Sequence, residues 1–166
     1  MVTDPAPETH VPVPGPTTGA ALEGDVVRVE LAALPSHVRT ARLICGAVAR
    51  RAGLDDSYVD ELKLAVGEAC TRAVELHAGE VPDLPVEVSL GWTRGLLTVE
   101  VSDRAGAEPV PDHSPVGLDL LERLADPDGG SAGLGLALVK GLVDDVTVAP
   151  REGGGTTITM RWPLRG

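Results

Sequence analysis

The helical stretch Glu61–His77 restricts the fold of this chain more than any other segment. Apolar residues recur there every three or four positions, so they line one side of a helix. This stripe consists of Val59, Leu62, Val66, Ala69, Ala73 and Leu76. It predicts a helix that buries one face against the rest of a domain. The charged residues Glu61, Glu68, Arg72 and Glu75 fall on the opposite side, where the simplest interpretation is a solvated face.

The segments around this helix carry equally readable patterns. Strands are predicted where apolar and polar residues alternate, and helices where the apolar spacing is three or four. Pro35 begins a first helix, since proline is tolerated at an early helical position, and Gly53 ends it. Asp55 or Asp56 caps the second. The other predicted elements are strand 26–31, a hairpin of strands 86–90 and 96–103, helix 134–142, and closing strands 145–150 and 156–164.

This order of elements predicts the fold class. Strand, helix, helix, hairpin, loop, helix and hairpin are typical of an α/β (α+β) two-layer sandwich, with a mixed, mostly antiparallel sheet and helices on one face. Residues 1–24 hold five prolines and predict a disordered tail, which leaves 25–166 as one domain. A proline-containing loop at about 104–132 is long enough to be a functional lid or a disordered segment, and 117–125 within it is compatible with a short helix.

Composition restricts the partners and the compartment. Only 2% of the 166 residues are aromatic and none is Phe, so the core is expected to be aliphatic. The net charge of -11 argues against nucleic acid and against an anionic membrane surface as partners. Because no signal-like or membrane-spanning apolar run is present, we expect a cytoplasmic protein. Cys45 and Cys70 both fall in helical patterns and are expected to be buried free thiols.

Two motifs place a carboxylate where a nucleotide could use it. Glu68, in EACTRAV, sits between the small residues Gly67 and Ala69, which leave room for a ligand to approach. A helix carboxylate can also be merely solvated. Asp103, in VSDRAGA, ends a strand, where an Asp can accept a hydrogen bond from an adenine amino group or simply start a turn.

Two further motifs are rich in glycine. GLGLALV, from Gly133 to Val139, opens a predicted helix whose first backbone N–H groups can receive phosphate oxygens. GGGTT, at 153–157, either brings a hydroxyl near a ligand or only turns the chain. A Rossmann site is excluded because no strand runs directly into Gly133, and a P-loop is excluded because no Gly-Lys-Ser/Thr run is present.

Taken in order, EACTRAV, VSDRAGA, GLGLALV and GGTTITM resemble the motifs of the GHKL ATPase superfamily. In particular they are similar to the anti-sigma-factor serine/threonine kinases of bacterial partner-switching systems, and the resemblance covers nearly everything after residue 25. It implies a Bergerat-type ATP-binding fold with Glu68 as the catalytic base. The ATP-binding residues that it implies are Arg72, Asp103, Gly106, Gly133, Leu134, Gly135 and Thr156.

The same resemblance implies partners and an activity. A sigma factor would be sequestered, and a STAS-type antagonist of the anti-sigma factor would be phosphorylated on Ser or Thr. Relatives commonly form homodimers, and the first strand is expected at a sheet edge. The alternative is a catalytically impaired module that switches partners without chemistry, with or without ATP.

Three positions depart from the family pattern. Arg72 replaces the Asn that holds Mg²⁺, and a guanidinium has no acceptor atom for a cation, so we assign no metal ligand. Ala105 and Ala107 stand where the second motif has glycines. Two interpretations of Arg72 stay open: a helical ion pair that neutralises Glu68, or a guanidinium that grips the phosphates in place of the metal. Kinase activity is therefore the family expectation that this sequence puts in question.

Overall fold

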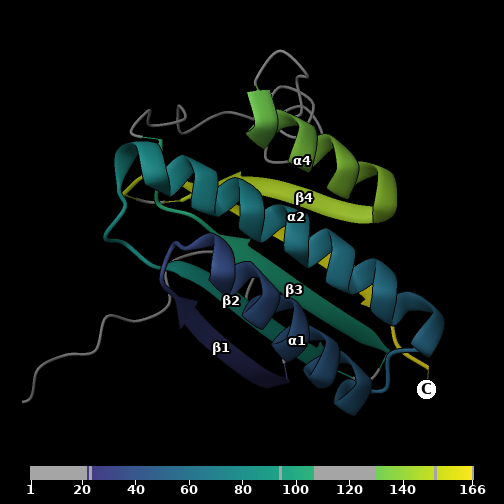
Figure 1. Cartoon of the computed structure of the whole chain (residues 1–166). Helices are drawn as coiled ribbons and strands as arrows, with labels where there is room; N and C mark the ends of the chain where they lie inside the picture. Colours follow the sequence, from purple (N-terminus) through teal and green to yellow (C-terminus); the bar gives the residue numbers. More distant parts are fainter. Residues whose placement is uncertain (1–21, 23, 94, 107–129, 152, 166) are drawn as a thin grey trace, which may run out of the picture.

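The protein is a two-layer structure, with helices on one face of a single sheet (Figure 1). The computed structural model describes residues 22, 24–93, 95–106, 130–151 and 153–165. The predicted tail and most of the predicted lid, including its helix at 117–125, lie outside the described residues. The predicted fold class is confirmed.

The sheet has five strands in the order β1-β2-β3-β5-β4. They are β1 (Asp25–Leu31), β2 (Val86–Thr93), β3 (Leu96–Ser102), β4 (Asp145–Pro150) and β5 (Thr156–Pro163). Every neighbouring pair is antiparallel, so the expectation of a mixed sheet was wrong. The reason is that β4 and β5 form a hairpin whose second strand lies antiparallel beside β3. β1 lies at one edge, as predicted.

The first hairpin is tighter than the sequence predicted. Thr93 pairs with Leu96, so β2 runs three residues past the predicted end at Leu90. Gly91 and Trp92 continue the ladder, and Gly95 turns the chain with a φ of +99°. Such a positive φ is strained for residues other than glycine.

Local capping explains where the first two helices begin and end. α1 (Pro35–Ala52) has proline in its first turn and ends at Gly53, which is left-handed and donates its N–H to the last turn. α2 (Asp56–Glu80) begins after Asp55, whose carboxylate accepts the Ser57 N–H at 2.9 Å. The third helix of the described chain, α4 (Gly130–Leu142), packs against α2, which therefore lies between α1 and α4 (Figure 1).

The core between the layers is mainly aliphatic, as predicted, and α2 is its central element. The predicted stripe is buried except for Leu76, which is half-buried. One aromatic side chain does enter the core: Trp162 on β5 is buried and donates its indole N–H to Glu61 at 2.8 Å. Glu61 is consequently half-buried rather than fully solvated.

Both cysteines are buried in the core and free, in agreement with the prediction. Loss of hydration on burial raises the pKa of the Cys45 thiol to about 12. Burial, together with the neighbouring Cys45, raises the pKa of Cys70 to about 12 as well. Neither thiol forms an appreciable fraction of reactive thiolate at neutral pH.

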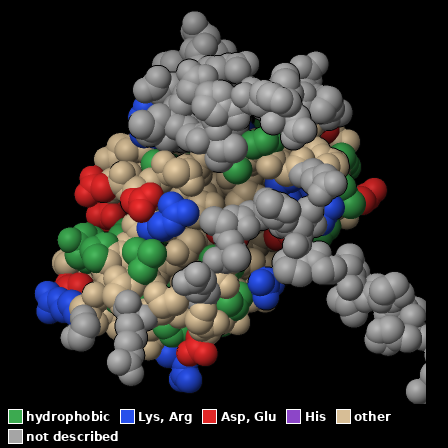
Figure 2. Space-filling model, turned by 180° about the vertical axis from the view of Figure 1, so that it is seen from behind, with side chains coloured by type: hydrophobic (Ala, Val, Ile, Leu, Met, Phe, Trp, Pro, Cys, Tyr) green, Lys and Arg blue, Asp and Glu red, His purple; other side chains and the backbone are tan. Residues whose placement is uncertain are grey.

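The opposite face of the sheet carries no helix in the described chain and is polar. Ser89, Glu100, Thr159 and Thr147 form one row across four strands. Figure 2, seen from behind, shows uncharged polar side chains and backbone over most of the coloured surface. This polarity explains why the helices gather on one face only. Within the described residues, no helix has the length and apolar character needed to cross a membrane.

Leu62→Asp should unfold the domain. Leu62 is 0% exposed, so an unpaired carboxylate would enter the core at a cost of more than about 4 kcal/mol. Circular dichroism with a urea titration measures the loss. Leu64→Asp is the matched control, because Leu64 lies on the same helix but is 37% exposed, and this variant should stay folded. A folded Leu62→Asp protein would show that the assigned buried face of α2 is wrong.

Candidate functional site

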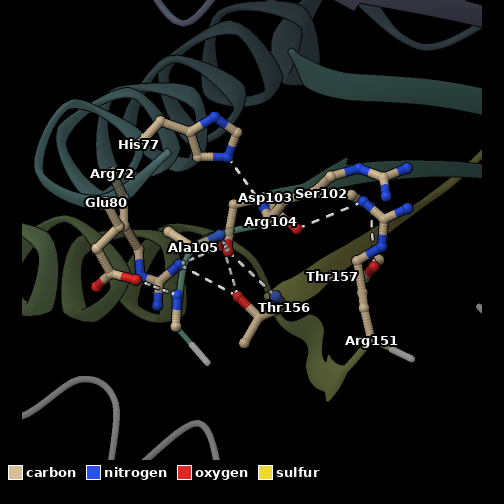
Figure 3. Close-up of polar contacts among 11 residues, drawn as sticks. Arg72, His77, Glu80, Ser102, Asp103, Arg104, Ala105, Arg151, Thr156 and Thr157 are labelled. Atoms are coloured by element: carbon tan, nitrogen blue, oxygen red, sulfur yellow. Dashed lines mark hydrogen bonds and ion pairs between the residues drawn. The ribbon is translucent and has the colours of Figure 1, made fainter. Parts of the chain in front are cut away.

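Four segments that are distant in the sequence meet on the helix side of the sheet. They are the C-terminal half of α2, the chain just after β3, the start of β5, and α4. A network of polar contacts centred on Asp103 joins the first three (Figure 3). The fold therefore brings together residues that the sequence analysis selected from separate motifs.

The carboxylate of Asp103 is buried and accepts four hydrogen bonds. Oδ2 accepts from Arg72 Nη1 at 3.0 Å and from the Thr156 hydroxyl at 2.6 Å. Oδ1 accepts from the backbone N–H groups of Thr156 at 3.1 Å and Ala105 at 3.2 Å. Since an ionised carboxylate offers about four acceptor positions, the group is saturated by its own protein. Asp103 is only 2% exposed.

Arg72 lies inside the protein, and the interpretation that it pairs with Glu68 was wrong. It is 6% exposed, and its guanidinium forms an ion pair with Asp103 rather than with Glu68. The reason is that α4 covers the side of α2 that the sequence alone leaves open. Nη1 also donates to the Thr156 hydroxyl at 3.3 Å, whereas Nε is buried and has no partner in the described structure.

Glu68 lies where α4 crosses α2. A Cβ added to Gly135 would lie 3.8 Å from Glu68 Oε2, which is an ordinary contact distance, so Gly135 of α4 lies directly against this carboxylate. Glu68 is half-buried, and no described side chain forms an ion pair or hydrogen bond with it. Its small neighbours do not make room for a ligand, contrary to expectation. Gly67 is covered by the side chain of Arg42, and Ala69 is in the core.

The glycine motif lies inside a helix rather than ahead of one. α4 begins at Gly130, four residues before the predicted start at Leu134, because the Gly-Ser-Ala-Gly run continues the helical backbone. Gly133 and Leu134 are therefore helical. A helix leaves its first four backbone N–H groups without helical partners, and in α4 these belong to residues 130–133, so only the first residue of GLGL contributes one.

Gly155 permits a close approach between β5 and the chain that follows β3. Its φ is +89°, and a Cβ there would overlap the backbone of Asp103 and Arg104. The Asp103 N–H donates to Thr156 O at 2.9 Å, and the Gly155 N–H donates to Gly106 O at 3.2 Å. The GGGTT motif thus turns the chain and also sets Thr156 against Asp103.

Two residues near the end of α2, His77 and Glu80, form hydrogen bonds to the backbone of the chain that follows β3. The sequence did not predict this role. His77 is 0% exposed; its Nδ1 donates to Leu84 O at 2.9 Å and its Nε2 accepts the Arg104 N–H at 2.9 Å. Glu80 Oε2 accepts the Gly106 N–H at 2.6 Å. Their spacing of three on one helix is the available sequence signal. The ring is neutral in this arrangement, since one nitrogen donates and the other accepts.

Two arginines near the chain that follows β3 form ion pairs with Glu87. Arg104 and Arg151 bond Glu87 at 2.7 Å and 3.0 Å, and Arg151 also reaches the carbonyl of Asp103 at 3.4 Å. Burial acts to raise the pKa of Glu87, but the two guanidinium groups outweigh it and leave that pKa below its usual value. Glu87 therefore offsets one of the two positive charges that lie beside the loop.

The site does not fit a metal ion held at position 72. A guanidinium only donates hydrogen bonds and cannot ligate a cation. Within the described ranges, no group of three or more His, Cys, Asp or Glu side chains is arranged to hold a metal.

His77→Leu should destabilise the protein, because it leaves the Arg104 N–H and the Leu84 carbonyl without partners. We expect the free energy of unfolding to fall by about 2–4 kcal/mol in a urea titration. His77→Gln keeps a donor and an acceptor and should lose less than half as much. The control is His37→Leu, since His37 makes a single hydrogen bond near the surface. Equal losses for the Leu and Gln variants of His77 would contradict a hydrogen-bonding role.

Comparison with known proteins gives consistent results. Residues 31–162 match the family described as Histidine kinase-like ATPase domain. Serine-protein kinase RsbW of Bacillus subtilis (strain 168) is 30% identical over 153 residues, which cover 86% of this chain and 88% of that protein. Serine-protein kinase RsbW of Bacillus pumilus (strain SAFR-032) is 32% identical over 146 residues, which cover 82% and 84%.

A solved structure has a similar fold. It is a crystal structure of the RsbU and RsbW domains of a Mycobacterium tuberculosis protein, with a TM-score of 0.56 and 22% sequence identity. The similarity covers 86% of this chain and 34% of that longer one. Since the family match spans most of the chain, and since relatives of 30% identity or more align with most of it, the protein belongs to the histidine kinase-like ATPase domain family.

Proposed function

We propose that this protein is an ATP-binding anti-sigma factor that acts by partner switching and phosphorylates a STAS-type antagonist on Ser or Thr. The observation that carries the proposal is the convergence of Glu68, Gly135, Asp103 and Thr156 on the helix side of the sheet. The RsbW relatives, which are named serine-protein kinases, support the same conclusion.

Glu68 is the proposed catalytic base. Its carboxylate is half-buried at the crossing of α2 and α4, and no described side chain neutralises it. It would take the proton from a Ser or Thr hydroxyl of the antagonist as that oxygen bonds the γ-phosphorus of ATP. The bond between the γ-phosphorus and its bridging oxygen breaks at the same step, and ADP leaves with the electron pair.

The proposed nucleotide contacts come from the chain after β3, the start of β5 and α4. Asp103, Thr156 and Gly106 would face the adenine. Gly133, Leu134 and Gly135 of α4 would face the phosphates, where the N–H groups of the first helical turn, which includes Gly133, and the helix dipole favour negative charge. We assign no step to Mg²⁺, because the residue at position 72 cannot ligate it.

The proposed partners are a sigma factor, which the protein sequesters, and the STAS-type antagonist, which releases it. Phosphorylation would dismiss the antagonist and free this protein to hold its sigma factor. β1 is an edge strand with unpaired backbone groups on its outer side and is the proposed site of homodimer pairing. The net charge of -11 favours basic partner surfaces, and the proposed setting is the cytoplasm.

A second candidate function is a partner-switching module that does not catalyse phosphoryl transfer. The buried ion pair between Arg72 and Asp103 favours it, because it fills the acceptor positions that the base of ATP would use. Phosphoryl transfer depends on positioning and charge neutralisation, so a missing metal ligand and a saturated Asp103 both oppose it.

Glu68→Ala should abolish transfer of label from γ-labelled ATP to the cognate antagonist, with a loss of at least about 100-fold in rate. Asp60→Ala is the control, since Asp60 is an exposed acidic residue on the same helix and its change removes the same charge. Native circular dichroism of both variants shows that the fold is intact. Absence of transfer by the unmodified protein, with ATP still bound, would favour the second candidate function.

ATP binding should depend little on magnesium. Isothermal titration of the unmodified protein should give dissociation constants in Mg²⁺ and in EDTA that agree within about twofold, since Arg72 offers no metal ligand. Arg72→Asn supplies an amide oxygen and should make binding tighter in Mg²⁺ than in EDTA. A strong preference of the unmodified protein for Mg²⁺ would contradict this assignment.

A further inference from the structure

The Arg72–Asp103 ion pair bears directly on how a nucleotide could enter this site. Among the described residues, Asp103 Oδ2 accepts two hydrogen bonds, from the guanidinium of Arg72 and from the Thr156 hydroxyl. Oδ1 is taken by two backbone N–H groups, of Thr156 and Ala105. Backbone donors and the hydroxyl of a strand residue are fixed by the fold. Of the four donors to the Asp103 carboxylate, Arg72 is the one on a long side chain, and so it is the one that can move away from Asp103.

An adenine amino group that bonds Asp103 needs one of these acceptor positions. In the described structure it would find all four in use, because the carboxylate is 2% exposed and saturated. Arg72 reaches Oδ2 from α2, with 7% of its side chain exposed, and Figure 3 shows its guanidinium between the helix and Asp103. The guanidinium of Arg72 and the adenine of the nucleotide therefore compete for one oxygen, Asp103 Oδ2.

We propose that Arg72 is an internal competitor for the nucleotide: its ion pair with Asp103 closes the base-recognition position, which opens only when Arg72 is released. The inference rests on the proposed function, since it assumes that the nucleotide base meets Asp103.

The geometry of the pair allows release. Only Nη1 of the guanidinium donates to Asp103, so the pair has one hydrogen bond. It lacks the bidentate arrangement that makes Arg–carboxylate pairs strong. Nε is buried without a partner among the described residues, which leaves the guanidinium incompletely satisfied. After release, Asp103 keeps three donors, and an adenine amino group restores the fourth.

The opposing interpretation is that Arg72 helps to bind the nucleotide by holding its phosphates. Adenosine separates the two interpretations, because it carries the base without phosphates and needs no metal. If Arg72 competes with the adenine, it weakens adenosine binding, and removing its side chain strengthens that binding. If Arg72 instead holds the phosphates of ATP, it has no effect on adenosine binding, and removing its side chain weakens the binding of ATP only.

The experiment is isothermal titration of adenosine and of ATP, both in EDTA, into the unmodified protein, Arg72→Ala and Arg161→Ala. We expect the dissociation constant for adenosine to fall at least tenfold in Arg72→Ala. It should stay within twofold in Arg161→Ala, where the same charge is lost from a pair with Asp145 on the sheet. If circular dichroism shows that Arg72→Ala does not fold, Arg72→Met, which keeps the length without a donor, replaces it with the same expectation.

The outcomes separate this inference from the proposed function. Suppose that the unmodified protein binds ATP, and that the Arg72 variant binds adenosine with unchanged or lower affinity. Then the proposal that Arg72 competes with the nucleotide is overturned, and nucleotide binding stands. If neither ligand binds any of the proteins, both the competitor and the proposed function are overturned.

Discussion

The buried carboxylate of Asp103 is the interaction on which the rest of the site depends. A charge this deep is tolerated only when it is paired and fully hydrogen-bonded, so the surrounding chain is arranged to supply donors. β5 supplies Thr156, the loop supplies the Ala105 N–H, and α2 supplies Arg72. Gly155 is required because only a residue without Cβ lets β5 come so near. One charge thereby ties a helix, two strand ends and a loop together.

Local patterns were sufficient to predict most of the fold. Alternation fixed the strands, apolar spacing fixed α1 and α2, and capping residues such as Asp55 and Gly53 fixed where those helices begin and end. The exceptions were β2, which extends through Gly91, and α4, which begins at Gly130. In both, pairing or packing with another segment continued an element that the isolated sequence would have ended.

The site was predicted less completely, because its residues act through neighbours that no local pattern reveals. Glu68 and Gly135 were selected from separate motifs, and the fold does bring them together. The burial of Arg72 and its pairing with Asp103 were not predicted, since the position of α4 cannot be read from the spacing of α2 alone. His77 gave no sequence signal beyond its place near a helix end and its spacing of three from Glu80. Its two partners, Leu84 and the Arg104 N–H, come from segments that only the folded chain puts within reach.

One helix carries both residues to which the proposed function gives separate roles. Glu68 and Arg72 are one turn apart on α2, yet Glu68 lies beside Gly135 of α4 while Arg72 reaches Asp103 at the end of β3. A change at position 72 therefore alters what Asp103 can accept without removing the carboxylate proposed as the base. Under the proposed function, access of the nucleotide and transfer of the phosphoryl group are then separable, because position 72 affects the first and Glu68 the second. On that proposal, Arg72 is better understood as a residue that changes how the site opens than as the loss of one metal contact.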